Sequence, residues 1–178
     1  YMVQEICFFL EALGVKIEGI GTSSLIVHGV KEINKNIEYW NSEDPIESMM
    51  FISAGIITDS RLTITRAPID FLSLELENLK RMNLKYKTSK TYYSYNGRTK
   101  LVDIEIFPSK LRALQDKLHS NPYPGINIDN LPFFVPIAIR AKGTTIIHDW
   151  VYENRAIYLT ELNRLGADIT LADPHRLY

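Results

Sequence analysis

The sequence predicts an α/β fold built from repeated units, each with strands on one side and a helix that must be enclosed. Three observations lead to this prediction. Two helical stretches, at residues 45–58 and 131–143, are almost wholly apolar or small, so neither can turn a polar face to water. An amphipathic helix that runs into a strand occurs three times along the chain. The second half also repeats the first at a shift of 83 residues.

The first elements are an amphipathic helix at residues 3–13 and a hairpin. The apolar face of the helix consists of Val3, Ile6, Cys7, Leu10 and Leu13. Strands are predicted at 15–20 and 25–30, with a turn at 21–24 between them. The glycines of "GIGTSS" are turn residues, because no helix opens after them as a phosphate-binding loop requires.

A buried helix, a strand and a second amphipathic helix follow. The helix at 45–58 is predicted to be buried along Ile46, Met49, Met50, Ser53, Ala54 and Ile57. A strand is predicted at 61–67, and a helix from Pro68, since proline is tolerated in a first turn. Short strands are predicted at 84–88, 91–95 and 101–107, with a hairpin turn at Asn96-Gly97. Residues 108–120 are predicted to form a helix, or a helical turn and a loop.

The second half repeats this order, with an apolar helix at 131–143, a strand at 144–149, an amphipathic helix at 153–166 and a strand at 167–172. The shift of 83 residues aligns Leu62 with Thr145, Ile64 with Ile147, Leu79 with Leu162 and Met82 with Leu165. The helix-then-strand ending recurs at 9–17, 78–86 and 161–169. Such repetition is typical of stacked supersecondary units.

Composition excludes several classes of function. The 178 residues carry a net charge of -1, which gives no electrostatic basis for binding nucleic acid or an anionic membrane. A local excess of Lys and Arg at 80–100 is interpreted as a solvated helix end and hairpin. No apolar run approaches the roughly 18 residues of a membrane span. The chain has a single cysteine, Cys7, so it cannot form an internal disulfide. Cys7 is interpreted as a core thiol, and the lack of a disulfide indicates a reducing cytoplasm.

Several polar residues remain as candidates for a site. Asp129 precedes the apolar run "LPFFVPIAI", so it is either a helix cap or a working group. His148 and Asp149 are adjacent in a predicted strand and should point to opposite faces, which argues against a dyad. The other histidines have no metal-ligand spacing.

The segment "PYPGINIDNLPFFVPIAIRAKGTTIIHDWVYENRAIYLTELNRLGADI", residues 122–169, resembles the enolpyruvyl transferases, and within them the branch that uses UDP-N-acetylglucosamine. The resemblance rests on Asp129 before the apolar helix, on Gly143-Thr144, on "ENR" at 153–155 and on "RLGA" at 164–167. The upstream segment "EDPIESMMFISAGIITDSRLTI" is similar to the corresponding segment of the family. The resemblance covers nearly the whole chain, from "QEICFFLEALGVKI" onward.

The resemblance implies an inside-out α/β barrel domain of repeated βαβαββ units, with buried helices and outer sheets. Residues 1–178 would then be one incomplete domain, with about two repeat units and the end of a preceding one, and the partner domain would be absent. The chain begins inside a helical pattern and ends at "DPHRLY" without a closing signal, which also suggests a piece of a larger protein. A piece of this kind is expected to be inactive alone.

The resemblance also implies a reaction and its residues. Enolpyruvyl would move from phosphoenolpyruvate to the 3-hydroxyl of UDP-N-acetylglucosamine, in peptidoglycan precursor synthesis and without a cofactor. Asp129 matches the aspartate that meets the sugar hydroxyl as a base, and Val151 matches a position whose backbone contacts the uridine diphosphate. Arg155 matches an arginine lining the cleft, where it could meet an anionic substrate or pair with Glu153 or another acid. The family's loop proton donor, its lysine-asparagine pair and the arginines that clamp phosphoenolpyruvate have no match in this chain.

Departures from the family pattern keep other functions open. The family has Pro-Thr-Asp-Met/Leu-Gln where this chain has Asn127-Ile128-Asp129-Asn130-Leu131, and it has Arg where this chain has Pro45. One alternative is a sister transferase acting on shikimate 3-phosphate or another alcohol. The other is a binding module that kept the fold and lost catalysis.

Overall fold

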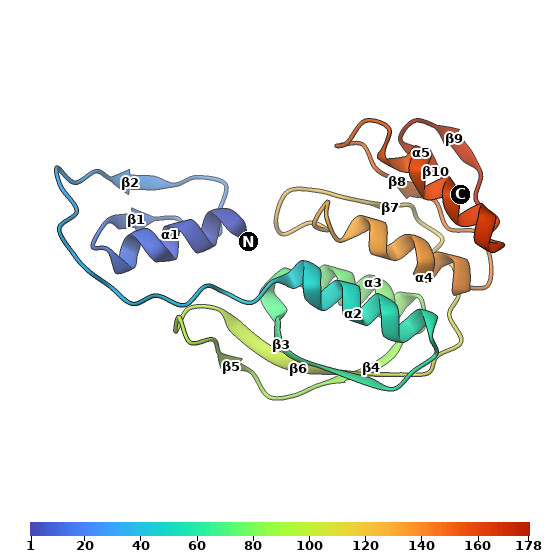
Figure 1. Cartoon of the computed structure of the whole chain (residues 1–178), viewed down its shortest axis with the longest axis horizontal. Coiled ribbons are helices and arrows are strands. Elements are labelled where there is room, and N and C mark those ends of the chain that lie inside the picture. The colour runs from blue at the N-terminus through green and yellow to red at the C-terminus, as the bar shows by residue number, and fades with distance from the viewer.

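Three separate sheets organise the chain, which a computed structural model describes over residues 1–178 (Figure 1). At the N-terminal end, α1 (Met2–Ala12) packs on an antiparallel hairpin of β1 (Lys16–Glu18) and β2 (Ile26–His28). Cys7 is buried and free, and it forms a small core with Val15 and Ile17. Cys7 is therefore a core thiol, as predicted. Val3 and Ile6 are exposed, because a two-stranded hairpin is too narrow to cover the rest of the apolar face.

The first apolar helix is α2 (Pro45–Ile57), close to the predicted range. Asp44 caps it by accepting a hydrogen bond from the N–H of Ile46 at 2.8 Å, and Pro45 occupies the first turn. The buried face was predicted partly wrongly. Met49 and Ser53 are buried as predicted, but Ile52 and Ile56 are buried in place of Met50 and Ile57, which are exposed. Because so many positions of α2 are apolar, their pattern marks no single face.

The second helix begins later than predicted. Pro68 is the last residue of β3 (Leu62–Pro68), where it pairs with Leu101. A 3-10 turn, η1 (Ile69–Phe71), separates it from α3 (Ser73–Arg81). Proline fits an extended backbone as well as a first helical turn, so its presence did not distinguish the two.

The first large sheet has the order β3-β6-β4, with β5 (Tyr92–Tyr93) pairing to β6 (Lys100–Phe107). Both β3 and β4 (Lys85–Thr88) run antiparallel to β6. The turn at Asn96-Gly97 is confirmed by hydrogen bonds from Gly97 N–H to the Ser94 carbonyl and from Ser94 N–H to the Thr99 carbonyl. Alternate residues of β3 and β6 are buried against the helices, so this sheet has one face on the core and one on solvent.

Residues 108–117 are extended rather than helical, which corrects the prediction. Leu111, Leu114 and Leu118 are buried at spacings that also suit a helix. Their backbone is bonded elsewhere: Arg112 N–H donates to the Met82 carbonyl at 3.0 Å. The chain then enters β7 (Leu118–His119).

The second apolar helix is shorter than predicted. It consists of a 3-10 turn, η2 (Leu131–Phe133), and α4 (Phe134–Arg140). Pro132 and Pro136 lack an N–H to donate, which explains the irregular start. The remaining elements are β8 (Ile147–His148), α5 (Arg155–Leu159), η3 (Thr160–Leu165), β9 (Leu171–Asp173) and β10 (Arg176–Leu177).

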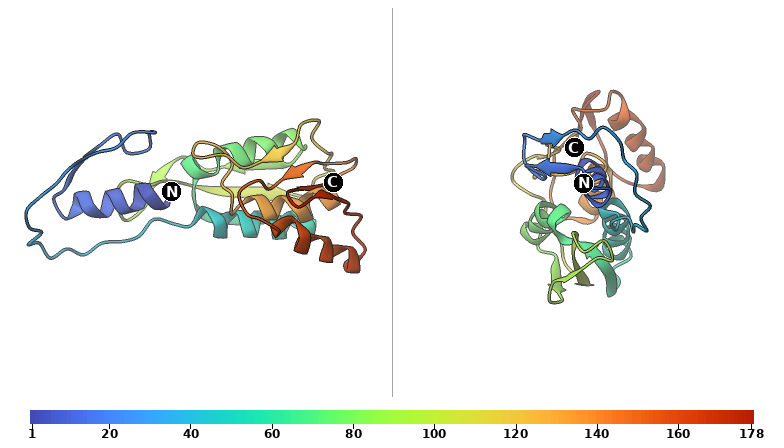
Figure 2. Two further views of the ribbon diagram at one scale, coloured as in Figure 1. Left: turned by 90° about the horizontal axis from the view of Figure 1, so that it is seen from above. Right: turned by 90° about the vertical axis from the view of Figure 1, so that its left-hand side faces the viewer.

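The second large sheet has the order β7-β8-β10-β9, and three of its strands repeat the arrangement of the first. β8 and β9 both pair antiparallel with β10 between them, as β3 and β4 do with β6, and helices connect β3 to β4 and β8 to β9. β7 lies beyond β8 and runs parallel to it. Helices α2 and α4 pack together, and one core of 25 buried residues joins both halves (Figure 2). The fold is a mixed α/β arrangement, as predicted, while the inside-out organisation of a whole domain stays a prediction.

Apolar residues of the second half are less completely buried than their counterparts in the first half. Met82 is fully buried, whereas Leu165, its counterpart under the shift of 83 residues, is 85% exposed. No helix of the chain combines the length and the apolar character needed to cross a membrane.

Candidate functional site

The loop that carries Asp129 connects β7 to η2 and is held by its own hydrogen bonds. The N–H of Asp129 donates to Oδ1 of Asn127 at 2.9 Å, and the N–H of Asn130 donates to the Asn127 carbonyl at 3.0 Å. Neither η2 nor α4 begins with a side-chain cap. The interpretation of Asp129 as a plain helix cap is therefore wrong. Its side chain is 34% exposed, so the carboxylate can meet a ligand.

Arg155 lies beside Asp129 at the start of α5, with its side chain only 12% exposed. Its Nη1 is 3.6 Å from Oδ1 of Asp129, and its Nη2 donates to the carbonyl of Ile128 at 2.7 Å. Its Nε donates to the carboxylate of Asp149. The guanidinium carbon also lies 4.5 Å from the centre of the Tyr152 ring, within the range of a cation–π contact. Arg155 thus fixes the Asp129 loop against the segment after β8.

Asp149 has a role that the sequence did not predict, since the sequence suggested it only as half of a dyad with His148, which was rejected. It lies directly after β8, and its side chain is 2% exposed. The alternative in which Arg155 pairs with an acid is confirmed, but the main partner is Asp149 rather than Glu153. The carboxylate of Asp149 accepts a hydrogen bond from Arg155. In the preceding residue, His148, burial lowers the pKa of the imidazole. The available signal was a short loop with an acid at its first position and an arginine six residues later.

The three charged groups form one continuous cluster, Asp129–Arg155–Asp149. The buried Asp149 neutralises Arg155, so the exposed Asp129 carboxylate keeps a net negative charge at the surface of the cluster. A carboxylate in this setting can accept a proton from a hydroxyl group placed within about 2.6–3.2 Å. No three histidine, cysteine or carboxylate side chains gather closely enough to hold a metal ion.

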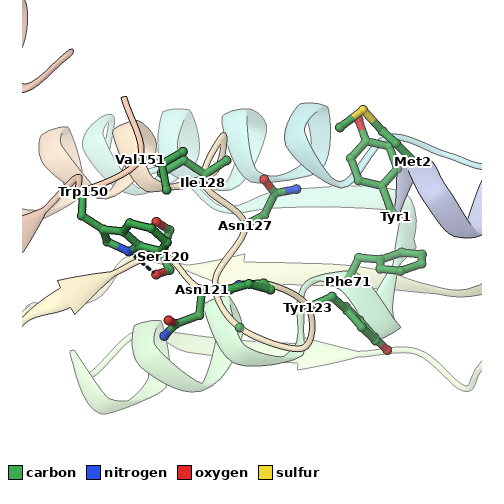
Figure 3. Close-up of a pocket in the computed structure, with 12 residues that line it drawn as sticks. Tyr1, Met2, Phe71, Ser120, Asn121, Tyr123, Asn127, Ile128, Trp150 and Val151 are labelled. Atoms are coloured by element: carbon green, nitrogen blue, oxygen red, sulfur yellow. Dashed lines mark hydrogen bonds between the residues drawn. The ribbon is translucent and has the colours of Figure 1, made fainter. Parts of the chain in front are cut away.

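A cavity of about 300 Å³ opens beside the Asp129 loop (Figure 3). Val151 and Ile128 lie close together on one side of it, with Trp150 and Asn127 nearby. The indole N–H of Trp150 donates to the carbonyl of Ser120 at 2.8 Å, which fixes the ring. The remaining lining residues are Tyr1, Met2, Phe71, Asn121, Pro122, Tyr123 and Gly125. The volume is at the lower end of the range for small-molecule sites.

The structure brings two of the three predicted site residues into contact, Asp129 and Arg155. Val151 is 44% exposed and lines the cavity together with Asn127 and Ile128, the two residues before Asp129, whereas Asp129 and Arg155 do not line it.

Comparison with known proteins gives a family match over nearly the whole chain. A model of EPSP synthase (3-phosphoshikimate 1-carboxyvinyltransferase) matches residues 2–175.

Curated relatives share one name, UDP-N-acetylglucosamine 1-carboxyvinyltransferase. The one from Sulfurimonas denitrificans is 35% identical over 170 residues, which are 95% of this chain and 37% of that protein. The one from Chloroherpeton thalassium is 34% identical over 166 residues, 93% of this chain and 36% of that protein. The one from Treponema denticola is 30% identical over 182 residues, 98% of this chain and 40% of that protein. The chain thus spans less than half the length of these relatives.

Proposed function

Since the chain belongs to the EPSP synthase (3-phosphoshikimate 1-carboxyvinyltransferase) family, we propose that it supplies part of the active site of an enolpyruvyl transferase acting on UDP-N-acetylglucosamine. The names of the curated relatives support this acceptor over shikimate 3-phosphate. The product would be a precursor of peptidoglycan. The observation that carries the proposal is the carboxylate of Asp129, about one-third exposed and held against Arg155, on a loop whose residues Asn127 and Ile128 line an open cavity.

The reaction joins the 3-hydroxyl oxygen of the sugar to C2 of phosphoenolpyruvate while a proton is added to the C3 methylene. The adduct then loses a proton from C3 and phosphate from C2, which restores the double bond. Asp129 is the proposed base that takes the proton of the sugar hydroxyl. General bases of this kind typically contribute about 10²–10⁴-fold to a rate. The carboxylate and phosphate of phosphoenolpyruvate are anionic throughout, and the phosphate gains further negative charge as it leaves in the second step, where cations stabilise it.

Arg155 has a proposed positioning role in this site, and a proposed contact with the anionic substrate through Nη1. Support comes from two hydrogen bonds that fix the guanidinium: Nε donates to Asp149 and Nη2 donates to the Ile128 carbonyl. Nη1 makes no hydrogen bond of its own and lies 3.6 Å from Oδ1 of Asp129. An arginine fixed in this way presents its remaining N–H groups with little loss of entropy.

Val151 is the proposed contact for the uridine diphosphate portion of the acceptor. Its support is the cavity that runs from Val151 to Asn127, two residues before Asp129. A nucleotide bound along Val151 would deliver its sugar toward the carboxylate. The flat ring of Trp150, which is fixed by the Ser120 carbonyl, offers an apolar wall for the base.

The rest of the site is proposed to come from a longer protein. The chain spans 36% of one relative and 40% of another, so a proton donor and cations for phosphoenolpyruvate can lie in the part of the relatives it does not match. The proposal includes one incomplete inside-out domain at 1–178, a second domain facing it, no cofactor and a cytoplasmic location. The free thiol of Cys7 supports a reducing compartment.

A substrate panel tests the proposal. The full-length protein that carries this chain is given phosphoenolpyruvate with either UDP-N-acetylglucosamine or shikimate 3-phosphate, and released phosphate is measured. Release with the nucleotide sugar supports the proposal. Release with shikimate 3-phosphate alone indicates the sister activity, and tight binding of the nucleotide sugar without release indicates a binding module.

A further inference from the structure

A second buried carboxylate, Glu75 of α3, lies directly beneath the Asp129 loop. Its side chain is almost wholly enclosed at 2% exposure, as is Asp149. Asp149 is paired with Arg155, whereas Glu75 forms no ion pair. Its Oε1 accepts one hydrogen bond from the backbone N–H of Asn127 at 3.1 Å and another from Nδ2 of Asn130 at 2.9 Å. Both partners belong to the loop, more than 50 residues along the chain.

The two asparagines lie on either side of Asp129. Asn127 is also the residue whose Oδ1 accepts the N–H of Asp129 at 2.9 Å. Asn130 is fully buried, and its only hydrogen bond from the side chain goes to Glu75, since its own Oδ1 has no partner. One oxygen of Glu75 therefore clamps the loop before and after the carboxylate of Asp129.

Stability alone does not account for Glu75. A buried carboxylate without a cation is unfavourable, and an apolar side chain of similar size would avoid that penalty. Burial raises the pKa of the Glu75 carboxyl, and the hydrogen bonds from Asn130 and Asn127 oppose the shift. The chain keeps this group at the one place where the loop offers two donors.

We propose that Glu75 is a positioning residue for Asp129, which fixes the place of its carboxylate by holding Asn127 and Asn130 on either side of it. The inference rests on the proposed role of Asp129. It predicts that α3 and the loop act as one unit in this protein, and that a change at Glu75 alters the rate more than it alters folding.

Two variants of Glu75 separate positioning from packing. Glu75→Gln keeps an oxygen that accepts from both asparagines, so the loop should stay in place. Glu75→Met keeps the volume but removes the acceptor, so the loop should loosen while the core stays filled. Asn78→Met is the matched control, because Asn78 is buried on the same helix and bonds only the Leu74 carbonyl of that helix.

The first measurement is phosphate release from phosphoenolpyruvate and UDP-N-acetylglucosamine by the full-length protein. Glu75→Met should lower kcat about 10–100-fold, as a displacement of a reacting group by about 1 Å does, with little change in KM for the nucleotide sugar. Glu75→Gln should stay within about threefold of the wild type, and Asn78→Met should leave kcat unchanged. A wild-type kcat in Glu75→Met, or an equal loss in Asn78→Met, would overturn the inference.

The second measurement is hydrogen exchange of the peptide covering residues 121–131, which needs no activity. Glu75→Met should raise exchange in this peptide about tenfold, while Glu75→Gln and Asn78→Met leave it unchanged. If the wild type releases no phosphate but Glu75→Met still shows increased exchange, the proposed function is refuted and the clamp is supported. Unchanged exchange in Glu75→Met would refute the clamp whatever the activity.

Discussion

Replacement of Arg155 by Gln tests whether the charged cluster holds the Asp129 loop. In the native chain Arg155 lies between Asp149, which is 2% exposed, and Asp129, which is 34% exposed. The substitution leaves Asp149 buried with one weak partner, the N–H of Tyr152 at 3.5 Å. It also removes the bond from the guanidinium to the Ile128 carbonyl.

The expected loss follows from these contacts. Breaking a buried pair by removing one partner destabilises a protein by about 3–5 kcal/mol, because the other charge stays buried without compensation. For a chain of 178 residues this corresponds to a fall in Tm of roughly 6–20 °C. Neutralising Asp149 as well removes the stranded charge. Asp149→Asn in the Arg155→Gln background should therefore recover stability, with a coupling energy of about 1–3 kcal/mol.

The assay is urea denaturation of the four proteins of this double-mutant cycle, followed by circular dichroism. Arg164→Gln is the matched control, because Arg164 pairs with Glu161 at 3.1 Å on the surface with its side chain 81% exposed. Such surface pairs contribute about 0–1 kcal/mol. A loss in Arg155→Gln no larger than that of the control, or strict additivity with Asp149→Asn, would refute the cluster as the support of the loop.

Three further predictions concern the framework of the site. Tyr92→Phe removes the hydroxyl that donates to Asp103 at 2.6 Å and should lower the free energy of unfolding in urea by about 1 kcal/mol. That bond lowers the pKa of Asp103, so its stabilisation is present at neutral pH and is lost on acidification. The difference in stability between the variant and the wild type should therefore be smaller below about pH 4 than at pH 7. Phe134→Ala should cost about 3–5 kcal/mol, since Phe134 is fully buried, while Phe51→Ala, at 45% exposure, should cost far less. Gly97→Ala should lower stability by about 1 kcal/mol by thermal denaturation, because Gly97 has φ +68° in the hairpin turn, and an unchanged Tm would contradict this reason.

The periodicity of apolar residues predicted where helices and strands occur better than it predicted which helix faces are buried and where each element begins and ends. The apolar run of α2 and the Asn96-Gly97 turn lie where the sequence placed them. The buried face of α2 did not follow, because apolar residues surround the helix and only its contact with α4 and β3 decides which are covered. Leu111, Leu114 and Leu118 are buried at a spacing that suits a helix, but their segment is not helical, because its backbone bonds other parts of the chain.

Site residues could be predicted from the sequence where a single residue belongs to a motif. They could not be predicted where the role depends on a contact between two residues. Asp129 and Arg155 belong to recognisable motifs, and the structure places them in contact, which the sequence did not predict. Asp149 and Glu75 carry no motif, and each becomes significant only through a partner: Arg155, six residues after Asp149, and Asn130, 55 residues after Glu75. Glu75 lies on a helix where an acid is ordinarily solvated, so its burial against Asn130 could not be inferred from the chain.

The central claim is that Asp129 accepts the proton of the acceptor hydroxyl. The most direct measurement is phosphate release by full-length Asp129→Ala and Asp129→Asn with phosphoenolpyruvate and UDP-N-acetylglucosamine, beside binding of the nucleotide sugar by calorimetry. A loss of about 10²–10⁴-fold in kcat with binding largely kept is the predicted result. Undiminished turnover in Asp129→Ala would contradict it.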